Sequence, residues 1–177
     1  MSKAEIAKRI YGASHITGTF TLRSGQVSHE YFDKYLFEAE PDLLKEIAKI
    51  MAPLIPAESE VIAGLEMGGI PIVTAISMEN GMPAAFVRKE AKTYGTCKLA
   101  EGAAVDGRQV CVIEDVVTSG GQIIESVREL RQRGAKVDTV VCVILRDPKA
   151  LDKLAAEGLT LLPAFTMEYI KEQVGVG

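Results

Sequence analysis

Two adjacent carboxylates stand directly before a turn of short side chains. Glu114 and Asp115 end an apolar run, and TSGG at 118–121 follows before apolar residues take up helical spacing. Small side chains let a tight turn present its backbone N–H groups outward, and the helix dipole attracts an anion to the same point. The turn therefore predicts a phosphate-binding loop. Carboxylates beside it can accept hydrogen bonds from sugar hydroxyls, so the motif favours a sugar phosphate as ligand.

Other phosphate motifs are missing from the sequence. Short apolar strands that end in Asp or Glu are common in α/β proteins, so the acidic pair alone is a weak sign of a site, which the TSGG turn strengthens. The chain contains no Gly-Lys pair, which rules out GxxxxGK[ST], and no GxGxxG follows an expected strand. The sequence therefore lacks the main motif of a P-loop NTPase and that of a dinucleotide-dependent dehydrogenase.

A basic segment is the second set of candidate residues. Arg88, Lys89, Lys92 and Lys98 fall within eleven residues and are opposed only by Glu90. The simpler interpretation is a solvated surface loop. The alternative is a mobile lid whose cations stabilise an anionic leaving group such as pyrophosphate and exclude water from it.

Aromatic and guanidinium side chains give two further candidates. Tyr31 and Phe32 lie in the segment 20–33, a hairpin that in the simplest interpretation only covers one edge of a sheet. Arg146 follows an apolar strand. In the simplest interpretation it pairs with the adjacent Asp147, as an Arg after a strand commonly does with a nearby Asp.

Hydrophobic periodicity predicts the elements that position these residues. Contiguous apolar runs predict buried parallel strands, and helical spacing predicts the helices between them. The expected strands are 61–64, 84–87, 109–114, 137–145 and 159–165, and the expected helices are 3–11, 41–54, 70–80, 121–133, 149–157 and 166–174. Segments 17–23 and 28–37 read as two antiparallel strands before the sheet, and residues 88–102 as a long polar loop. In such a sheet, ligands bind outside the carboxyl ends of the strands.

Length and composition limit the class of protein. The 177 residues fit one domain, and a formal net charge of −4 argues against a protein that mainly coats nucleic acid. The three cysteines form no CxxC pair and are expected to be reduced thiols. The first residues lack a signal-peptide pattern, and no apolar run approaches the ~18 residues of a membrane span. We expect a cytoplasmic protein with no nucleic-acid and no membrane partner.

The segment VIEDVVTSGGQ at 112–122 resembles the 5-phosphoribosyl 1-pyrophosphate (PRPP) signature of type I phosphoribosyltransferases. The resemblance implies that Glu114 and Asp115 face the ribose hydroxyls and that residues 118–122 wrap the 5′-phosphate. The family more often has two aspartates, and Glu114 keeps the carboxylate.

A second segment, GLEMGGIP at 64–71, resembles the pyrophosphate loop of the same family. There, backbone amides at a helix N-terminus bind the anion. Many members have Tyr-Lys where this chain has Met67 and Gly68, so the resemblance implies main-chain contacts alone.

Two more segments resemble the orotate phosphoribosyltransferases in particular. VRKEAKTYG at 87–95 is similar to their catalytic loop, which implies that Arg88, Lys89 and Lys92 hold the pyrophosphate. In that family the loop, here 88–98, covers the active site of the neighbouring subunit, so a homodimer is implied. Tyr94 stands where many members have His, which makes Lys92 the stronger candidate for catalysis.

The pattern FTLRSGQVSHEYFD is similar to the hood of the same family. It implies that Tyr31 and Phe32 face the pyrimidine ring, while Arg23, where many members carry Lys, approaches the base and the pyrophosphate. Arg146 and Thr118 are implied to contact orotate as well.

Together these resemblances imply an α/β protein with the type I phosphoribosyltransferase fold. Its central parallel sheet has about five strands, helices on both faces and a small N-terminal hood. One domain is expected over 1–177, with the hood at about 1–40 and the PRPP-binding core at about 41–177.

The implied reaction joins orotate and PRPP to give orotidine 5′-monophosphate and pyrophosphate. Mg²⁺ is the implied cofactor, held through the substrate, with Glu114 and Asp115 nearby and no protein ligand assigned. The implied catalytic residues are Lys92, Arg88, Asp115 and Glu114. The implied PRPP contacts are Arg23, Arg88, Lys89, Lys92, Tyr94, Glu114, Asp115, Val116, Val117, Thr118, Ser119, Gly120, Gly121, Gln122, Met67 and Gly68.

Two rival functions remain open from the sequence. The enzyme could serve another base, such as uracil or a purine. Alternatively, the chain could be a PRPP-sensing regulator without catalysis. Regulators of that kind usually carry a nucleic-acid-binding domain or basic face, for which this acidic chain leaves little room.

Overall fold

Buried β-branched runs form a central sheet flanked by helices in the computed structural model, which describes residues 1–22, 24–91 and 98–176. The helices are α1 (Lys3–Ser14), α2 (Lys34–Glu38), α3 (Pro41–Met51), α4 (Gly69–Asn80), α5 (Gly121–Gln132), α6 (Lys149–Ala155) and α7 (Met167–Val174), and a short 3-10 helix (Ala52–Leu54) follows α3. The strands are β1 (His15–Thr21), β2 (Val27–Phe32), β3 (Val61–Leu65), β4 (Ala84–Val87), β5 (Ala100–Gly102), β6 (Gln109–Val117), β7 (Lys136–Leu145) and β8 (Thr160–Thr166).

The main sheet has the strand order β5-β4-β3-β6-β7-β8. Strands β4, β3, β6, β7 and β8 run parallel, with Ala63 opposite Val112 and Val140 opposite Leu161. This confirms the expected parallel sheet of about five strands. The prediction that 88–102 is entirely loop was wrong at its end, where β5 pairs antiparallel with β4. The three residues of β5 are too few to show a hydrophobic period.

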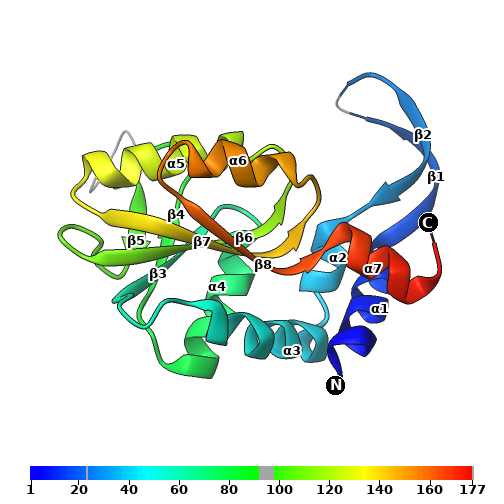
Figure 1. Ribbon diagram of the computed structural model, residues 1–177, viewed down its shortest axis with the longest axis horizontal. Coiled ribbons are helices and arrows are strands. Elements are labelled where there is room, and N and C mark those ends of the chain that lie inside the picture. Colours follow the sequence, from blue (N-terminus) through cyan, green and yellow to red (C-terminus); the bar gives the residue numbers. More distant parts are fainter. Residues whose placement is uncertain (23, 92–97, 177) are drawn as a thin grey trace.

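Helices cover both faces of this sheet, as expected (Figure 1). On one face, α5 and α6 pack against strand residues that include Val112 and Val140. On the other, α1, α3 and α4 pack against residues that include Ile113 and Val141. Because neighbouring strand residues point to opposite faces, each central strand supplies both apolar layers.

A two-stranded antiparallel hairpin, β1 with β2, stands outside the main sheet (Figure 1). This confirms the two strands expected before the sheet. We call α1, β1, β2 and α2 the hood. Helix α7, which follows the last strand, packs against α1. The Lys3 ammonium lies 5.3 Å from the centroid of the Phe165 ring and 5.6 Å from that of Tyr169. The hood is therefore braced by a segment from the other end of the chain.

The first helix runs further than expected. Its predicted start is confirmed, because Ser2 and Glu5 form a reciprocal capping box. Gly12 was expected to end the helix, which was wrong, since α1 continues to Ser14. Ile10 and Ser14 are four residues apart and both are buried, so the buried stripe of the helix continues past the glycine.

The second strand of the hairpin is shorter than expected. Residues 34–37 were predicted to continue it, but β2 ends at Phe32 and α2 begins at Lys34. The Asp33 side chain caps this helix by accepting a hydrogen bond from the N–H of Tyr35, at 3.1 Å. The other helices and strands begin and end within about three residues of their expected positions, the usual uncertainty of such boundaries.

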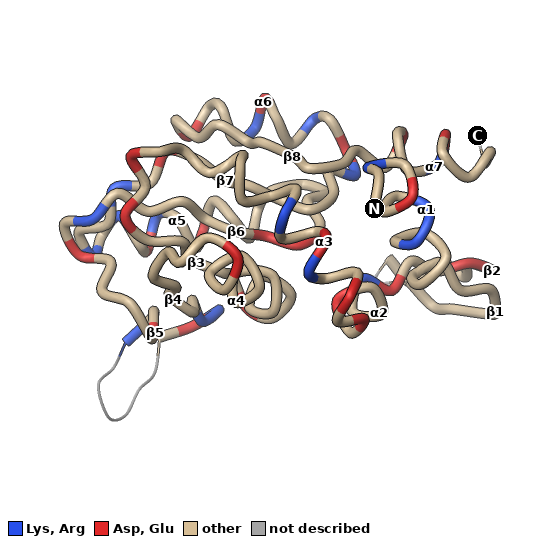
Figure 2. Tube along the Cα trace, turned by 90° about the horizontal axis from the view of Figure 1, so that it is seen from below, with Lys and Arg blue, Asp and Glu red and all other residues tan. Residues whose placement is uncertain are grey.

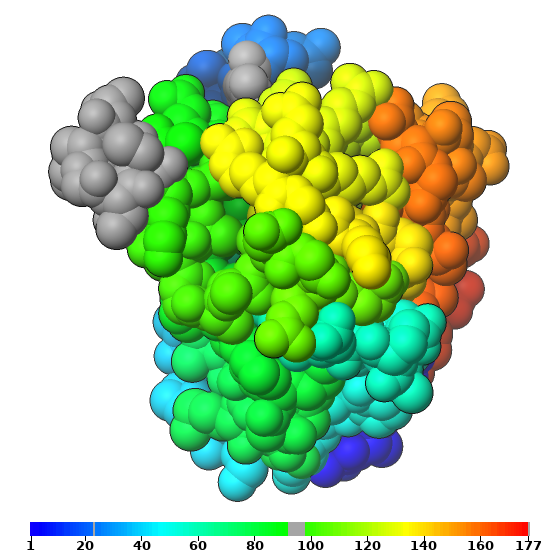
Figure 3. All heavy atoms as spheres, turned by 90° about the vertical axis from the view of Figure 1, so that its left-hand side faces the viewer, coloured from blue at the N-terminus to red at the C-terminus, as the bar shows by residue number. Residues whose placement is uncertain are grey.

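Tight turns close the amino edge of the sheet. In Figure 3 the chain before β6 lies beside the turn between α5 and β7. The N–H of Gly107 donates to the carbonyl of Gly134 at 2.9 Å. Gly134 has a φ of 86°, and a Cβ there would lie 1.9 Å from an Asp106 carboxylate oxygen, so glycine is required. The predicted site residues lie at the opposite edge.

Candidate active site

The predicted site residues gather at the carboxyl edge of the sheet. Strands β3, β4, β6 and β7 end there, and the loops that follow them lie outside the same edge. In chain order these loops carry Met67 and Gly68, Arg88 and Lys89, residues 118–122, and Arg146. One edge of the sheet therefore brings together motifs that are far apart in the sequence.

The turn after β6 encloses a cavity of about 280 Å³, here called the turn pocket. It is lined by Glu114, Val116, Val117, Thr118, Ser119, Gly120, Gly121, Gln122 and Ile123. Gly120 has a φ of 72°, a left-handed conformation that favours glycine, and it directly precedes the first residue of α5. The first N–H groups of a helix lack partners within the helix. The turn pocket is therefore suited to a phosphate.

The two adjacent acidic side chains, Glu114 and Asp115, point to opposite faces of the sheet. Glu114 lines the turn pocket on the α5 side, whereas Asp115 is not among its walls and is 0% exposed. Burial, together with the negative charge of Asp115, raises the pKa of Glu114 well above its usual value. The acidic pair therefore contains two different groups, one open to the pocket and one enclosed.

The loop between β3 and α4 passes directly over Asp115. A Cβ on Gly68 would lie 1.5 Å from Asp115 Oδ2, so only glycine allows the backbone to come this close. The adjacent Met67 is exposed. Gly64 is constrained too, since a Cβ there would lie 2.3 Å from the carbonyl oxygen of Gly69 at the start of α4. The two glycines hold this loop and helix α4 close to the end of the sheet.

The start of the basic segment is anchored to its neighbours. Arg88 Nε lies 3.7 Å from Glu101 Oε1 on β5. The backbone N–H of Lys89 donates to the side-chain carboxylate of Glu66 in the β3–α4 loop. Three further predicted site residues, Arg23, Lys92 and Tyr94, lie outside the described residues, so their roles stay predictions.

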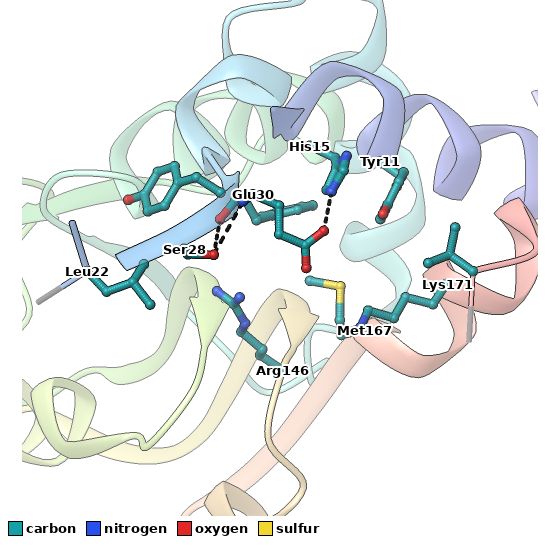
Figure 4. A pocket seen from close by; sticks show the side chains of 11 residues that line it. Tyr11, His15, Leu22, Ser28, Glu30, Arg146, Met167 and Lys171 are labelled. Atoms are coloured by element: carbon teal, nitrogen blue, oxygen red, sulfur yellow. Dashed lines mark hydrogen bonds and ion pairs between the residues drawn. The ribbon is translucent and has the colours of Figure 1, made fainter. Parts of the chain in front are cut away.

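A larger pocket of about 360 Å³ opens between the hairpin and the end of β7 (Figure 4). We call it the hood pocket. Tyr31 and Phe32 of β2 line it together with Arg146, which points toward the hairpin in Figure 4. Thr118, the fourth predicted base contact, lines the turn pocket instead. The two pockets adjoin, since the N–H of Arg146 donates to the carbonyl of Val117 at 2.8 Å.

Sequence reasoning missed several walls of the hood pocket. His15 Nε2 lies 2.9 Å from Glu30 Oε2, and this hydrogen bond and the charge of His15 hold the pKa of Glu30 below its usual value. Tyr11 stacks on His15 with ring centroids 4.7 Å apart, and Met167 and Lys171 enter from α7. These residues share no spacing pattern, because the tertiary fold alone brings α1, the hairpin and α7 together.

Sequence reasoning also missed a cation beside the acidic pair. Lys34 Nζ on α2 lies 2.6 Å from Asp115 Oδ2. The lysine lay in a segment expected to continue a strand, so no helical face was predicted there. Asp147 was the partner considered for Arg146 in the simpler interpretation. Its Oδ1 accepts a hydrogen bond from the N–H of Lys149 at 3.0 Å.

Comparison with known proteins gives the class that this sheet and its carboxyl edge define. The phosphoribosyl transferase domain family matches residues 37–160. That range begins at the end of the hood and includes both the β3–α4 loop and the turn pocket.

Two relatives narrow the class of protein. An orotate phosphoribosyltransferase of Nocardioides sp. is 52% identical over 92% of this chain and 91% of its own length. That of Methanocella arvoryzae is 44% identical over 80% of this chain and 81% of its own. This chain belongs to the orotate phosphoribosyltransferase family.

Solved structures agree with the fold. The orotate phosphoribosyltransferase of Mycobacterium tuberculosis H37Rv in complex with Fe(III) dicitrate has a TM-score of 0.86 and 30% identity, covering 95% of this chain and 98% of that one. The same enzyme in complex with PRPP has a TM-score of 0.81 and 28% identity, with the same coverage. The hood as well as the core is therefore shared with solved members of the family.

Proposed function

We propose that this protein transfers the 5-phosphoribosyl group of PRPP to orotate, giving orotidine 5′-monophosphate and pyrophosphate. The observation that carries the proposal is the pair of adjoining cavities at one sheet edge. The turn pocket suits a sugar phosphate, and the hood pocket joins two aromatic rings to the Arg146 guanidinium, which suits a planar anion. The names of the relatives and the PRPP complex of the tuberculosis enzyme support both halves.

The chemistry needs alignment more than acid–base catalysis. The bond from ribose C1′ to the pyrophosphate oxygen breaks, and a bond from C1′ to N1 of orotate forms. Orotate arrives as an anion, so no strong general base is required. Residues 118–122 would hold the 5′-phosphate, and Glu114 and Asp115 would face the ribose hydroxyls. The main barrier is charge developing on pyrophosphate in an oxocarbenium-like transition state, which positioned cations stabilise.

Mg²⁺ is the cofactor that this chemistry calls for. The carboxyl of Glu114 beside the turn pocket is an oxygen ligand of the kind that Mg²⁺ prefers, and such ions usually keep several waters and substrate oxygens. Within residues 1–22, 24–91 and 98–176, no group of three His, Cys, Asp or Glu side chains is arranged to hold a metal. We assign no protein ligand directly and place Glu114 and Asp115 near the ion. When bound, the ion would neutralise charge on the pyrophosphate.

A shared basic loop completes the proposed site. Arg88, Lys89 and Lys92 would hold the pyrophosphate, with Tyr94 beside them, and the loop 88–98 would reach the active site of a second subunit. This makes a homodimer part of the proposal. Lys92→Ala should lower turnover by about 10²-fold, the usual effect of removing one charge-stabilising donor. Steady-state kcat measures this, and near-normal turnover would remove Lys92 from the catalytic set.

Hybrid dimers test the sharing of this loop. Mixing Lys92→Ala protomers with Asp115→Asn protomers should produce some dimers in which one site has both residues intact. Activity should then rise above that of either variant alone. If mixed and unmixed samples are equally inactive after subunit exchange has been verified, each loop serves its own subunit.

One assay tests the proposed reaction as a whole. Orotate absorbance should fall only when PRPP and Mg²⁺ are both present, and uracil, adenine and xanthine under the same conditions should give much slower turnover. Consumption of another base in preference to orotate would change the assigned substrate. PRPP binding without turnover of any base would favour the regulator instead.

The proposed setting is the cytoplasm, as one domain with a hood at about 1–40 and a core at about 41–177. No helix among the described residues is long and apolar enough to cross a bilayer. Burial raises the pKa of the Cys111 thiol to about 12 and also raises that of Cys142, which supports reduced, unreactive thiols at these two positions. Acidic and basic residues are interspersed along the trace (Figure 2), which supports small-molecule substrates over nucleic acid.

A further inference from the structure

One turn of a hood helix faces a carboxylate of the core. Lys34 and Glu38 are four residues apart on α2, so both project from the same side of the helix. Lys34 Nζ lies 2.6 Å from Asp115 Oδ2 on β6. The charge of Asp115 also acts on the Glu38 carboxyl, whose pKa it helps to raise. The hood, which supplies walls to the base pocket, thereby also touches the sugar half of the site.

Burial distinguishes this ion pair from those on the surface. Asp115 is 0% exposed and Glu38 is 7% exposed, whereas the Lys34 side chain is 35% exposed. Exposed pairs add little, because water and salt screen them. When one partner is completely buried, removing the other leaves a charge without compensation in a poorly solvated place. Removing Lys34 would therefore leave the buried Asp115 side chain without this ammonium partner.

Lys34 contacts the carboxyl of Asp115 and influences the pKa of the Glu38 and Glu114 carboxyls. Burial and the charge of Asp115 raise the pKa of Glu38 to about 8 and that of Glu114 well above its usual value, while the charge of Lys34 opposes both shifts. Burial lowers the pKa of Lys34, but the hydrogen bond and charge of Asp115 outweigh it and raise that pKa overall. Lys34 thus stays an ammonium beside the buried Asp115 side chain.

Three contacts hold the Asp115 side chain in one orientation. The N–H of Val116 donates to Oδ1, Lys34 binds Oδ2, and Gly68 lies so close to Oδ2 that no Cβ fits between them. Of these three contacts, the one from Lys34 comes from the hood. Loss of Lys34 would free the carboxylate on the side that faces the hood.

We propose that Lys34 is a positioning residue for PRPP, which holds the Asp115 side chain in its orientation so that the β3–α4 loop and the ribose site are formed. This inference rests on the proposed function and assigns to the hood a part in PRPP binding. The inference predicts different effects on the binding of the two substrates. Loss of Lys34 should weaken the site for PRPP much more than for orotate, because Lys34 is not among the walls of the hood pocket.

Lys34→Met tests this, since it removes the ammonium and keeps an unbranched side chain. Its matched control is Lys49→Met on α3, where the ammonium lies 2.7 Å from Glu46 on the surface. We expect the KM for PRPP to rise about 10- to 100-fold in Lys34→Met, by analogy with the loss of residues that orient metal-binding side chains. The KM for orotate should stay within about threefold, and both constants should be unchanged in Lys49→Met. Lys34→Arg should recover most of the PRPP affinity.

Melting temperatures identify variants that fail to fold. If Lys34→Met does not fold, Lys34→Gln, which keeps a hydrogen-bond donor and removes the charge, decides by the same criterion. A folded neutral variant with unchanged KM for PRPP overturns the inference, as does an equal rise in both KM values. Failure of the proposed function is distinct, because wild type would then consume no orotate in the same assay.

Discussion

Asp115→Asn should lower kcat/KM for PRPP by about 10²-fold, a loss of roughly 3 kcal/mol of transition-state stabilisation. Asparagine preserves the shape of the side chain and removes its charge. It leaves the Lys34 ammonium, now 2.6 Å from a carboxylate, facing a neutral amide, and it withdraws the proposed acceptor for a ribose hydroxyl. Steady-state kinetics with PRPP as the varied substrate measure the loss.

Stability should fall less than activity in this variant. Breaking a completely buried pair costs several kcal/mol, but the Lys34 side chain is 35% exposed, so solvent screening reduces the loss to about 1–2 kcal/mol. The control is Glu60→Gln, which removes the carboxylate 2.7 Å from Arg108 Nη1, just before β3 and β6 begin. Its kinetics should match wild type. An Asp115→Asn enzyme with wild-type kcat/KM would exclude the carboxylate from substrate recognition.

Gly68→Ala is expected to impair activity to a similar degree through the same carboxylate. The added methyl group would stand 1.5 Å from Asp115 Oδ2 and 2.5 Å from its Cγ, so either the carboxylate or the β3–α4 loop must move. Asp115 is enclosed and held by Lys34, so it has little room to yield. We expect kcat/KM for PRPP to fall by about 10²-fold, as for other displaced site groups. Kinetics and melting temperature together measure the effect.

Gly12→Ala is the matched control for this substitution. Gly12 lies within α1, and a Cβ there would meet no atom within 4 Å. Alanine should therefore leave activity unchanged and stabilise the helix by about 0.5–1 kcal/mol. If Gly68→Ala behaves like Gly12→Ala, the close packing of the β3–α4 loop on Asp115 has no role in function.

Much of the core could be predicted because its strands are buried on both faces. Runs such as VIAG at 61–64 and AAFV at 84–87 are contiguous, apolar and bounded by turn residues, and both became strands at those positions. Strand β5 could not be predicted, because its three residues pair only through their position beside β4. Helix α2 was missed because YFDKYLF is rich in aromatics that favour strands, and the local cap by Asp33 decided otherwise.

The candidate site could likewise be predicted from the sequence only in part. The turn pocket could be predicted, because strand, acidic pair, turn and helix are contiguous in the chain and form one local structure. The partners of Asp115 could not, because Lys34 and Gly68 reach it from a different helix and a different loop. His15, Glu30 and Lys171 belong to the same class, since no local pattern relates α1, the hairpin and α7.

The packing of α7 on α1 gives the hood pocket an order of assembly. The residues that line the turn pocket end at Ile123, so this segment is synthesised well before α7. The hood pocket needs Met167 and Lys171 of α7 among its walls, and the last strand, β8, ends directly before that helix. Because domains are synthesised from the N-terminus, the hood pocket would be completed only with the last helix, after the segment that forms the turn pocket has left the ribosome.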